Sequence, residues 1–229
     1  MVANGLSGCD EEYDRLRATE LACFFSLHER NMMAEEIRAA LWPGDLESGE
    51  GSPKSLRTAI SNLRAFLGHK HLPEAFKGTG YRLVGATSDW SRFQELAALA
   101  RAEPDRQVEL RWQALDLVRG APFAGVAPGT YSWAFTELFV ARMEKAISEA
   151  AHRLATIMLD SSHAEGARSA AMKGLTASPY NRSLWSDMLR AAALDGVAAL
   201  DKEWKNVQSV LGADAEDLRA LYEELRASN

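Results

Sequence analysis

Apolar residues recur at helical spacing along almost the whole chain, and this pattern indicates a mainly helical fold. It is clearest in the segment SPKSLRTAISNLRAFLG, where the recurring apolar residues are Leu56, Ile60, Leu63 and Leu67. Ser52 followed by Pro53 predicts the start of a helix over 53–67, because a hydroxyl caps the first turn and proline fits its first position. Gly68 predicts the end of this helix.

One short segment departs from the helical pattern. Helices over 14–30 and 33–42 are predicted before the helix 53–67, whereas EAFKGTGYRLVG follows it. This stretch places aromatic and β-branched residues on both sides of Gly78-Thr79-Gly80, which predicts a small β-hairpin over 76–84. Three helices followed by a hairpin is the order of a winged helix-turn-helix. We therefore expect residues 1–88 to form a winged-helix DNA-binding domain.

The rest of the chain is predicted to be helical throughout. Helices are expected over 89–102, 105–119, 132–161, 163–176, 180–194, 196–211 and 214–227. The segments 162–175 and 194–207 look alike at an offset of 32 residues, close to the roughly 34-residue period of tetratricopeptide helix pairs. The expected fold is thus mainly α, with a tetratricopeptide-like all-α helical-repeat domain over 89–229 after the winged helix.

Three aromatic residues, Tyr131, Trp133 and Phe135, follow the glycine- and proline-rich connection 120–129. Burial against the long helix expected over 132–161 is the simpler interpretation, and capping of an exposed groove is the alternative.

Charge is distributed unevenly along the chain, whose net charge is −6. Residues 1–50 hold 11 acidic and 4 basic residues, and residues 89–229 hold 20 acidic and 16 basic ones. Residues 51–88 hold 6 basic residues and one acid, Glu74. A local basic surface can attract phosphates even on an acidic protein.

The helix 53–67 is the best candidate for a functional site. In helix-turn-helix proteins one helix enters the major groove, where Arg, Asn, Ser and Thr bond base edges or phosphates. The candidate DNA-binding residues on the face away from the leucines are Lys54, Arg57, Thr58, Ser61, Asn62 and Arg64. The expected wing adds Lys77, Thr79 and Arg82. A solvated amphipathic helix without a ligand explains the helix alone equally well, and the hairpin favours DNA.

Other classes of function have little support in the sequence. Two cysteines and five scattered histidines lack metal-ligand spacing, so no metal site is expected. Phosphate loops, nucleophile elbows and zinc-protease motifs are absent, so we expect neither a cofactor nor an enzyme. No signal peptide or membrane-spanning segment is apparent, which predicts a reduced, cytoplasmic protein.

Several segments resemble a known family. LACFFSLHER, AEEIRAALWP, SPKSLRTAISNLRAFLG and KGTGYRL resemble the OmpR-type winged-helix DNA-binding domain, with its N-terminal sheet reduced or missing. DWSRFQELAALAR, RGAPFAGV with the following Tyr-x-Trp, and SPYNRSLWSDMLRAA resemble the bacterial transcriptional activator domain. Together they resemble the SARP transcriptional regulators of actinobacteria. The resemblance implies that 53–67 is the recognition helix and 76–84 the wing.

Two hypotheses follow. The first is a SARP-type transcription regulator that binds double-stranded DNA, with the helical domain supporting homodimerisation or contacts with RNA polymerase. The alternative is a protein–protein interaction module with a degenerate, non-DNA-binding winged helix. RGAPFAGVAPGTYSWA also resembles the cytoplasmic C-terminal part of larger membrane or LysM-containing proteins, so the chain is alternatively a piece of such a tethered protein.

Overall fold

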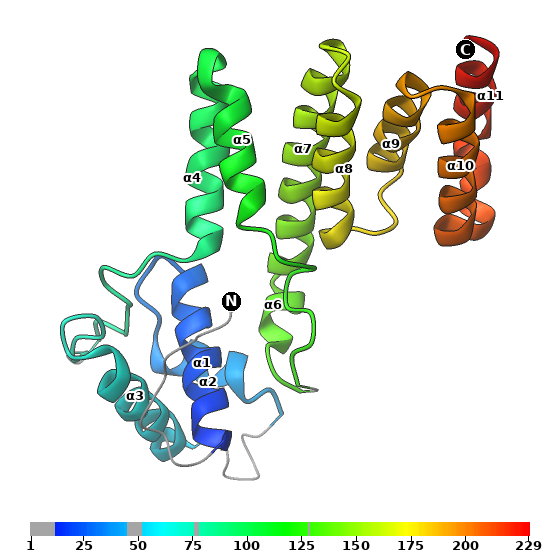
Figure 1. The fold of residues 1–229 in the computed structure, drawn as a ribbon. Coiled ribbons are helices and arrows are strands. Elements are labelled where there is room, and N and C mark those ends of the chain that lie inside the picture. The colour runs from blue at the N-terminus through cyan, green and yellow to red at the C-terminus, as the bar shows by residue number, and fades with distance from the viewer. Residues whose placement is uncertain (1–11, 45–51, 76–77, 128) are drawn as a thin grey trace. The chain divides into compact units, whose positions relative to one another are not determined.

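A computed structural model describes residues 12–44, 52–75, 78–127 and 129–229. Its described residues are mainly helical, and the chain forms two compact units (Figure 1). Unit 1 comprises Met1–Ser91 and Gly125–Phe139, and unit 2 comprises Arg92–Ala124 and Val140–Asn229. This differs from the expected division at 88/89 in two respects: the boundary lies at 91/92, and the segment Gly125–Phe139 belongs with the first unit.

Unit 1 contains four described helices: α1 (Glu12–Leu27), α2 (Ala34–Leu41), α3 (Pro53–Leu67) and α6 (Ser132–Thr136). The predicted bounds of α3 are confirmed. The Ser52 side chain accepts a hydrogen bond from the Ser55 amide at 3.2 Å, Pro53 occupies the first turn, and Gly68 ends the helix with φ of 81°.

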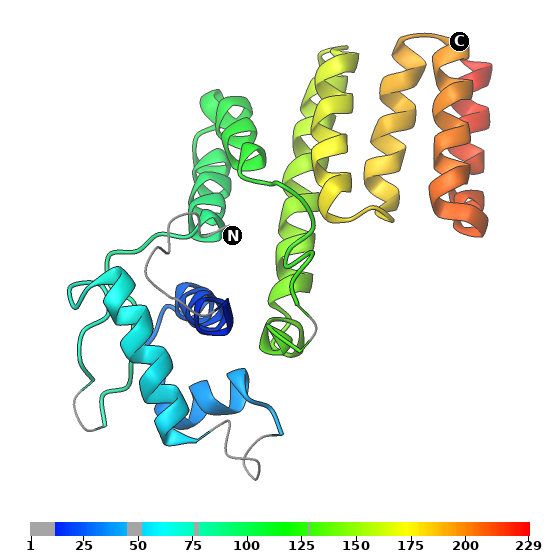
Figure 2. The same cartoon turned by 60° about the horizontal axis from the view of Figure 1, so that its bottom comes forward.

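Helix α3 packs on α1 and α2 (Figure 2). Its buried face, formed by Leu56, Ala59, Ile60 and Leu63, is the face predicted from the spacing. On α1 the buried residues include Leu21, Phe24 and Phe25. Cys23 is buried with them, and burial raises the pKa of its thiol to about 12.

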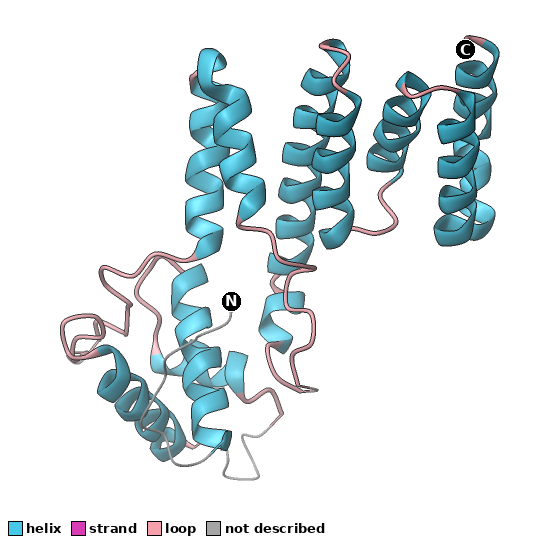
Figure 3. Cartoon of the chain, viewed as in Figure 1, coloured by secondary structure: helices cyan, strands magenta, loops and turns pink. Residues whose placement is uncertain are grey.

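The predicted β-hairpin over 76–84 is not confirmed. Phe76 and Lys77 lie outside the described residues, and the described part of the segment contains no strand (Figure 3). Tyr81 instead forms an isolated antiparallel bridge with Met32, in the connection between α1 and α2. Each residue donates its amide to the other's carbonyl at 2.8 Å. The Tyr81 segment therefore pairs with a stretch of chain that is distant in sequence.

The segment Gly125–Phe139 joins unit 1 through Trp133, which is only 2% exposed. The Trp133 ring lies edge-on to Phe24 of α1 with centroids 5.0 Å apart. His28 Nε2, just after α1, is 2.7 Å from Glu137 Oε2, and Phe135 is exposed. The expected burial of Trp133 is thus correct, but α1 provides much of the surface that covers it.

Unit 2 is built from helices that stand side by side (Figures 1 and 2). Most of α4 (Asp89–Ala102) leads through the 3₁₀ turn η1 (Pro104–Arg106) to α5 (Gln107–Asp116). The others are α7 (Phe139–Asp160), α8 (Ala164–Ala177), α9 (Arg182–Leu194), α10 (Val197–Leu211), η2 (Gly212–Leu218) and α11 (Arg219–Ala227). The two similar segments noted in the sequence correspond to α8 and α10.

One helix prediction for this region was too long. A single helix over 132–161 was expected, but α6 ends at Thr136 and α7 starts at Phe139. Leu138, between them, has φ of 61°, a left-handed conformation that interrupts an α-helix. The break follows the segment whose Trp133 is buried in unit 1.

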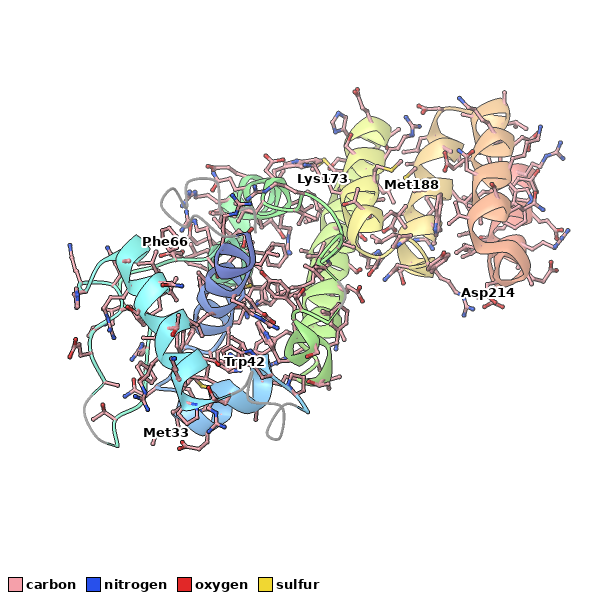
Figure 4. The ribbon with its side chains drawn as sticks, turned by 90° about the horizontal axis from the view of Figure 1, so that it is seen from below. Met33, Trp42, Phe66, Lys173, Met188 and Asp214 are labelled. Carbon is pink, nitrogen blue, oxygen red and sulfur yellow. The ribbon has the colours of Figure 1, made fainter. Side chains whose placement is uncertain are left out.

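Small residues let the helices of unit 2 approach closely. The buried side of α8 is formed mainly by alanine and glycine, whereas α9 contributes Leu184, Met188 and Leu189. Figure 4 shows Met188 on α9, between α8 and α10. A Cβ atom added to Gly174 of α8 would lie 2.6 Å from Leu184 Cδ1 of α9 and 2.7 Å from Ala151 Cβ of α7. Glycine at position 174 is therefore a packing requirement.

Candidate nucleic-acid interface

The candidate surface is the side of α3 that faces away from α1 and α2. Lys54, Arg57, Thr58 and Ser61 are exposed there, and Asn62 is half-buried. No acidic residue occurs in α3. Because the leucine face is fixed against the core, the helix holds these polar side chains together on its outer side.

Several cations on and near α3 form no ion pair among the residues that the structure describes. Among the residues that the structure describes, no carboxylate forms an ion pair with Lys54, Arg57, Lys70 or Arg82. Many cations elsewhere are paired: Arg92 with Glu95 at 2.6 Å, and Arg106 with Glu103 at 2.8 Å. An exposed cation that forms no ion pair attracts phosphate more strongly than one whose charge is paired.

A neighbouring cation in unit 1 illustrates the contrast. Arg30 bonds Glu36 of α2 at 2.7 Å, and Glu36 also accepts the Met33 amide at the start of α2 at 2.8 Å. The Arg30 hydrogen bond, followed by that amide, lowers the pKa of the Glu36 carboxyl to about 2. Arg30 is therefore part of a cap for α2, and its charge is largely balanced.

Arg64 is engaged within the protein. Its Nε donates to the Leu72 carbonyl at 2.8 Å and its Nη2 to the Pro73 carbonyl at 3.3 Å. These bonds hold the connection after α3 against the helix. Arg64 thus positions this loop. The helical pattern did not indicate this role, because the pattern describes the helix and not the path of the loop that supplies the two carbonyls.

The structure describes two of the three residues that were expected on the wing. Lys77 lies outside the described residues, whereas Thr79 and Arg82 are exposed. Between these two, Gly80 has φ of 70°, and a Cβ atom there would lie 2.7 Å from the Met32 carbonyl oxygen. Gly80 and Tyr81 therefore anchor the segment to the α1–α2 connection, with Thr79 and Arg82 on either side of the anchor.

The second arm of this loop is also fixed. Val84 donates its amide to the His71 carbonyl at 2.8 Å, and His71 Nδ1 lies 2.9 Å from the Val84 carbonyl oxygen. Both ends of the loop that follows α3 are thus tied to unit 1. Such anchoring lowers the entropy lost when the loop is ordered against a ligand.

Within residues 12–44, 52–75, 78–127 and 129–229, no group of three or more His, Cys, Asp or Glu side chains is arranged to hold a metal ion. Within the same residues, no helix has the length and apolar character needed to cross a bilayer.

Comparison with known proteins gives no family for the chain. No family model matches the sequence, and a search of curated proteins finds no match.

Proposed function

We propose that the chain is a DNA-binding transcription regulator in which unit 1 is a winged helix-turn-helix and α3 is its recognition helix. The observation that carries this proposal is the outer face of α3, where Lys54 and Arg57 have no carboxylate partner among the described residues. A helix of 15 residues that packs on two others and presents such a face has the form needed to enter a major groove.

Each residue has a role in this proposal. Lys54 and Arg57 contact phosphates or guanine, and Thr58, Ser61 and Asn62 contact base edges or phosphates. Arg64 acts through the loop that it holds. Lys77, Thr79 and Arg82 contact the DNA backbone from the wing, which the Met32–Tyr81 bridge supports as an anchored element.

The helical unit has a supporting role in the same proposal. It provides a surface for homodimerisation or for RNA polymerase, as in the SARP regulators that the sequence resembles. The proposal assigns the cytoplasmic chain no catalytic step and no cofactor.

The test is fluorescence anisotropy of labelled duplex DNA with the full chain, between about 20 and 200 mM salt. Three to five phosphate contacts predict a slope of roughly −3 to −4 in a plot of log affinity against log salt. K54A/R57A should lower the affinity and reduce the magnitude of the slope by about 2. K202A/K205A is the matched control, because it removes the same charge from exposed positions of α10 and should change neither quantity.

Two results would overturn the proposal. One is the absence of duplex binding at about 20 mM salt. The other is binding that K54A/R57A and K202A/K205A weaken equally, since the interface would then lie elsewhere. Either result favours the alternative, an interaction module whose winged helix no longer binds DNA.

A further inference from the structure

His28, just after α1, has both of its ring nitrogens engaged. Nδ1 lies 2.8 Å from the Phe24 carbonyl oxygen, and Nε2 lies 2.7 Å from Glu137 Oε2. The His28 side chain is only 8% exposed, whereas that of Glu137 is 41% exposed. One imidazole ring therefore connects the end of α1 with the segment Gly125–Phe139, within unit 1.

The two partners of His28 determine which of its nitrogens carry hydrogen. A carbonyl oxygen only accepts hydrogen bonds, so Nδ1 must donate to Phe24. An ionised carboxylate also only accepts, and a carboxyl side chain is ordinarily ionised at neutral pH. Nε2 must therefore donate to Glu137. A neutral imidazole has a single N–H and cannot donate from both nitrogens, so this geometry requires the imidazolium form.

The aromatic surroundings of the ring also favour a cation. His28 lies over Phe24, with ring centroids 4.1 Å apart and ring planes tilted by 34°. Phe139 and Trp133 are close as well, with centroids 5.1 and 5.8 Å from that of His28. The face of an aromatic ring attracts a cation within about 6 Å of its centroid. The position over Phe24 therefore offsets part of the cost of burying the charge.

The other charged groups around His28 belong to α2 and to the connection between α1 and α2. Glu36 of α2 is paired with Arg30 at 2.7 Å. This hydrogen bond is the main cause that lowers the pKa of Glu36, and the charge of His28 contributes less. The same hydrogen bond is the main cause that raises the pKa of Arg30, and the charge of Glu137 contributes less. Arginine and glutamate ordinarily keep their charges between about pH 5 and 8, so His28 is the member of this group whose charge changes there.

We propose that His28 is a proton-operated latch between α1 and the segment Gly125–Phe139. As an imidazolium it donates to Phe24 and Glu137 at once, and the latch is closed. After losing its proton it has one N–H for two acceptors, so one contact breaks and the attraction to the Glu137 charge is lost. The segment is therefore held more firmly at low pH and less firmly at high pH. This inference concerns unit 1 itself and does not rest on DNA binding.

The test is a double-mutant cycle of H28F and E137A, measured by hydrogen exchange of the amides of residues 131–139 in the full chain. Phenylalanine keeps an aromatic ring beside Phe24 but has no N–H, and alanine removes the carboxylate. After correction for the intrinsic pH dependence of exchange, the rates give the equilibrium constant of local opening. At about pH 5.5, where histidine is ordinarily charged, the substitutions should be coupled about fivefold, since solvent screens part of this charged hydrogen bond. At about pH 8.5 the coupling should fall below about twofold.

H69A is the matched control, because His69 is an exposed histidine of unit 1. This variant should leave the exchange of residues 131–139 and its pH dependence unchanged. The latch is overturned if H28F and E137A are uncoupled at the lower pH, because the contact would then hold nothing. It is also overturned if their coupling is the same at both pH values, because the contact would then be independent of the proton.

A second measurement uses the wild-type chain alone, so it does not depend on whether H28F folds. Proton–nitrogen NMR spectra of the imidazole rings distinguish a protonated nitrogen from an unprotonated one, and magnetisation transfer to the Phe24 ring identifies the His28 signals. Both nitrogens of His28 should be protonated at about pH 5.5, and only one at about pH 8.5. An unprotonated Nε2 at the lower pH would refute the latch, because a protonated Glu137 would then be the donor to a neutral ring.

Discussion

The buried carboxylate of Glu20 accepts a hydrogen bond from the Tyr131 backbone amide at 2.6 Å, across 111 residues of sequence. Its second oxygen accepts a bond from Arg17 Nη1, also at 2.6 Å, and Arg17 in turn donates to the Leu41 carbonyl at the end of α2. Tyr131 has φ of 56°, a strained conformation for a residue other than glycine. Glu20 thus links α1, the end of α2 and the returning segment within unit 1.

This role gives Glu20 a large expected effect on stability. E20A leaves the Arg17 charge and the Tyr131 amide without their acceptor, and breaking a buried pair of this kind costs about 3–5 kcal/mol. Urea unfolding should show the loss, and hydrogen exchange should assign it to unit 1. E29A, at an exposed position just after α1, is the control and should change stability by less than about 0.5 kcal/mol. Equal effects of the two variants would contradict the linking role.

The close approach of Gly80 to Met32 predicts that G80A destabilises the loop after α3. A Cβ atom would collide with the Met32 carbonyl oxygen at 2.7 Å, and the positive φ adds strain. We expect a loss of about 1–3 kcal/mol together with weaker duplex binding. G78A has a similar φ of 85° but nothing within 4 Å, so it carries the strain without the collision. If both variants behave alike, the contact with Met32 contributes nothing.

Asp187 of α9 predicts a specific pH dependence of stability. Its residue is 1% exposed and its Oδ2 lies 2.6 Å from His152 Nδ1 of α7. Burial raises the pKa of Asp187 above its ordinary 3.8, although the hydrogen bond from His152 and the charges of His152 and Arg190 lower it in part. The folded protein therefore holds this proton more tightly than the unfolded chain does.

The sign of the effect follows from that difference. The stabilisation associated with the raised pKa is complete below pH 3.8 and is lost as the pH rises through the folded value. D187N removes the titration, so the free energy of unfolding of the wild type relative to D187N should fall as the pH rises above 3.8. Urea unfolding in a pH series that begins below 3.8 measures it. A difference that is constant or that rises with pH would refute the prediction.

The glycine at position 174 predicts a packing penalty in unit 2. G174A gains up to about 1 kcal/mol of helix propensity, but its methyl group meets Leu184 and Ala151 at 2.6 and 2.7 Å. Overpacking of this kind costs about 1–3 kcal/mol, so we expect net destabilisation in chemical unfolding. G120A meets nothing within 4 Å and should leave stability unchanged or slightly higher. A G174A protein as stable as G120A would show that the helices readily separate.

Local signals predicted the local structure well. The Ser52-Pro53 start, the Gly68 end and the leucine spacing together determine α3, because capping and amphipathic burial act within a few residues. The same reasoning fails for Leu16 of α1. The spacing of Leu16, Cys23, Phe24 and Leu27 predicts that they share one apolar face, but Leu16 is 44% exposed. Which face of α1 is buried depends on α3 and on the Trp133 segment, and the spacing within α1 contains neither.

The spacing of apolar residues did not predict the contacts between residues far apart in the sequence. Nothing near Trp133 in the sequence indicates Phe24 as its neighbour, and nothing near Tyr81 indicates Met32. No sequence pattern marks Arg111 of α5 as buried, because the burial of one side chain depends on how the helices of unit 2 pack. The candidate DNA face was accessible to prediction since it lies on one helix, whereas the engagement of Arg64 depends on the path of the loop after it.

The placement of Gly125–Phe139 in unit 1 has a consequence for synthesis on the ribosome. Unit 1 starts with the first residues to emerge, yet its core lacks Trp133 until the helix pair α4–α5 has also been translated. Domains usually fold in order as they leave the ribosome. In the nascent chain of this protein, Phe24 and Glu20 instead lack their partners until the residues up to position 139 have left the ribosome. When the ribosome is stalled at residue 100, proteases should therefore still cleave the first unit.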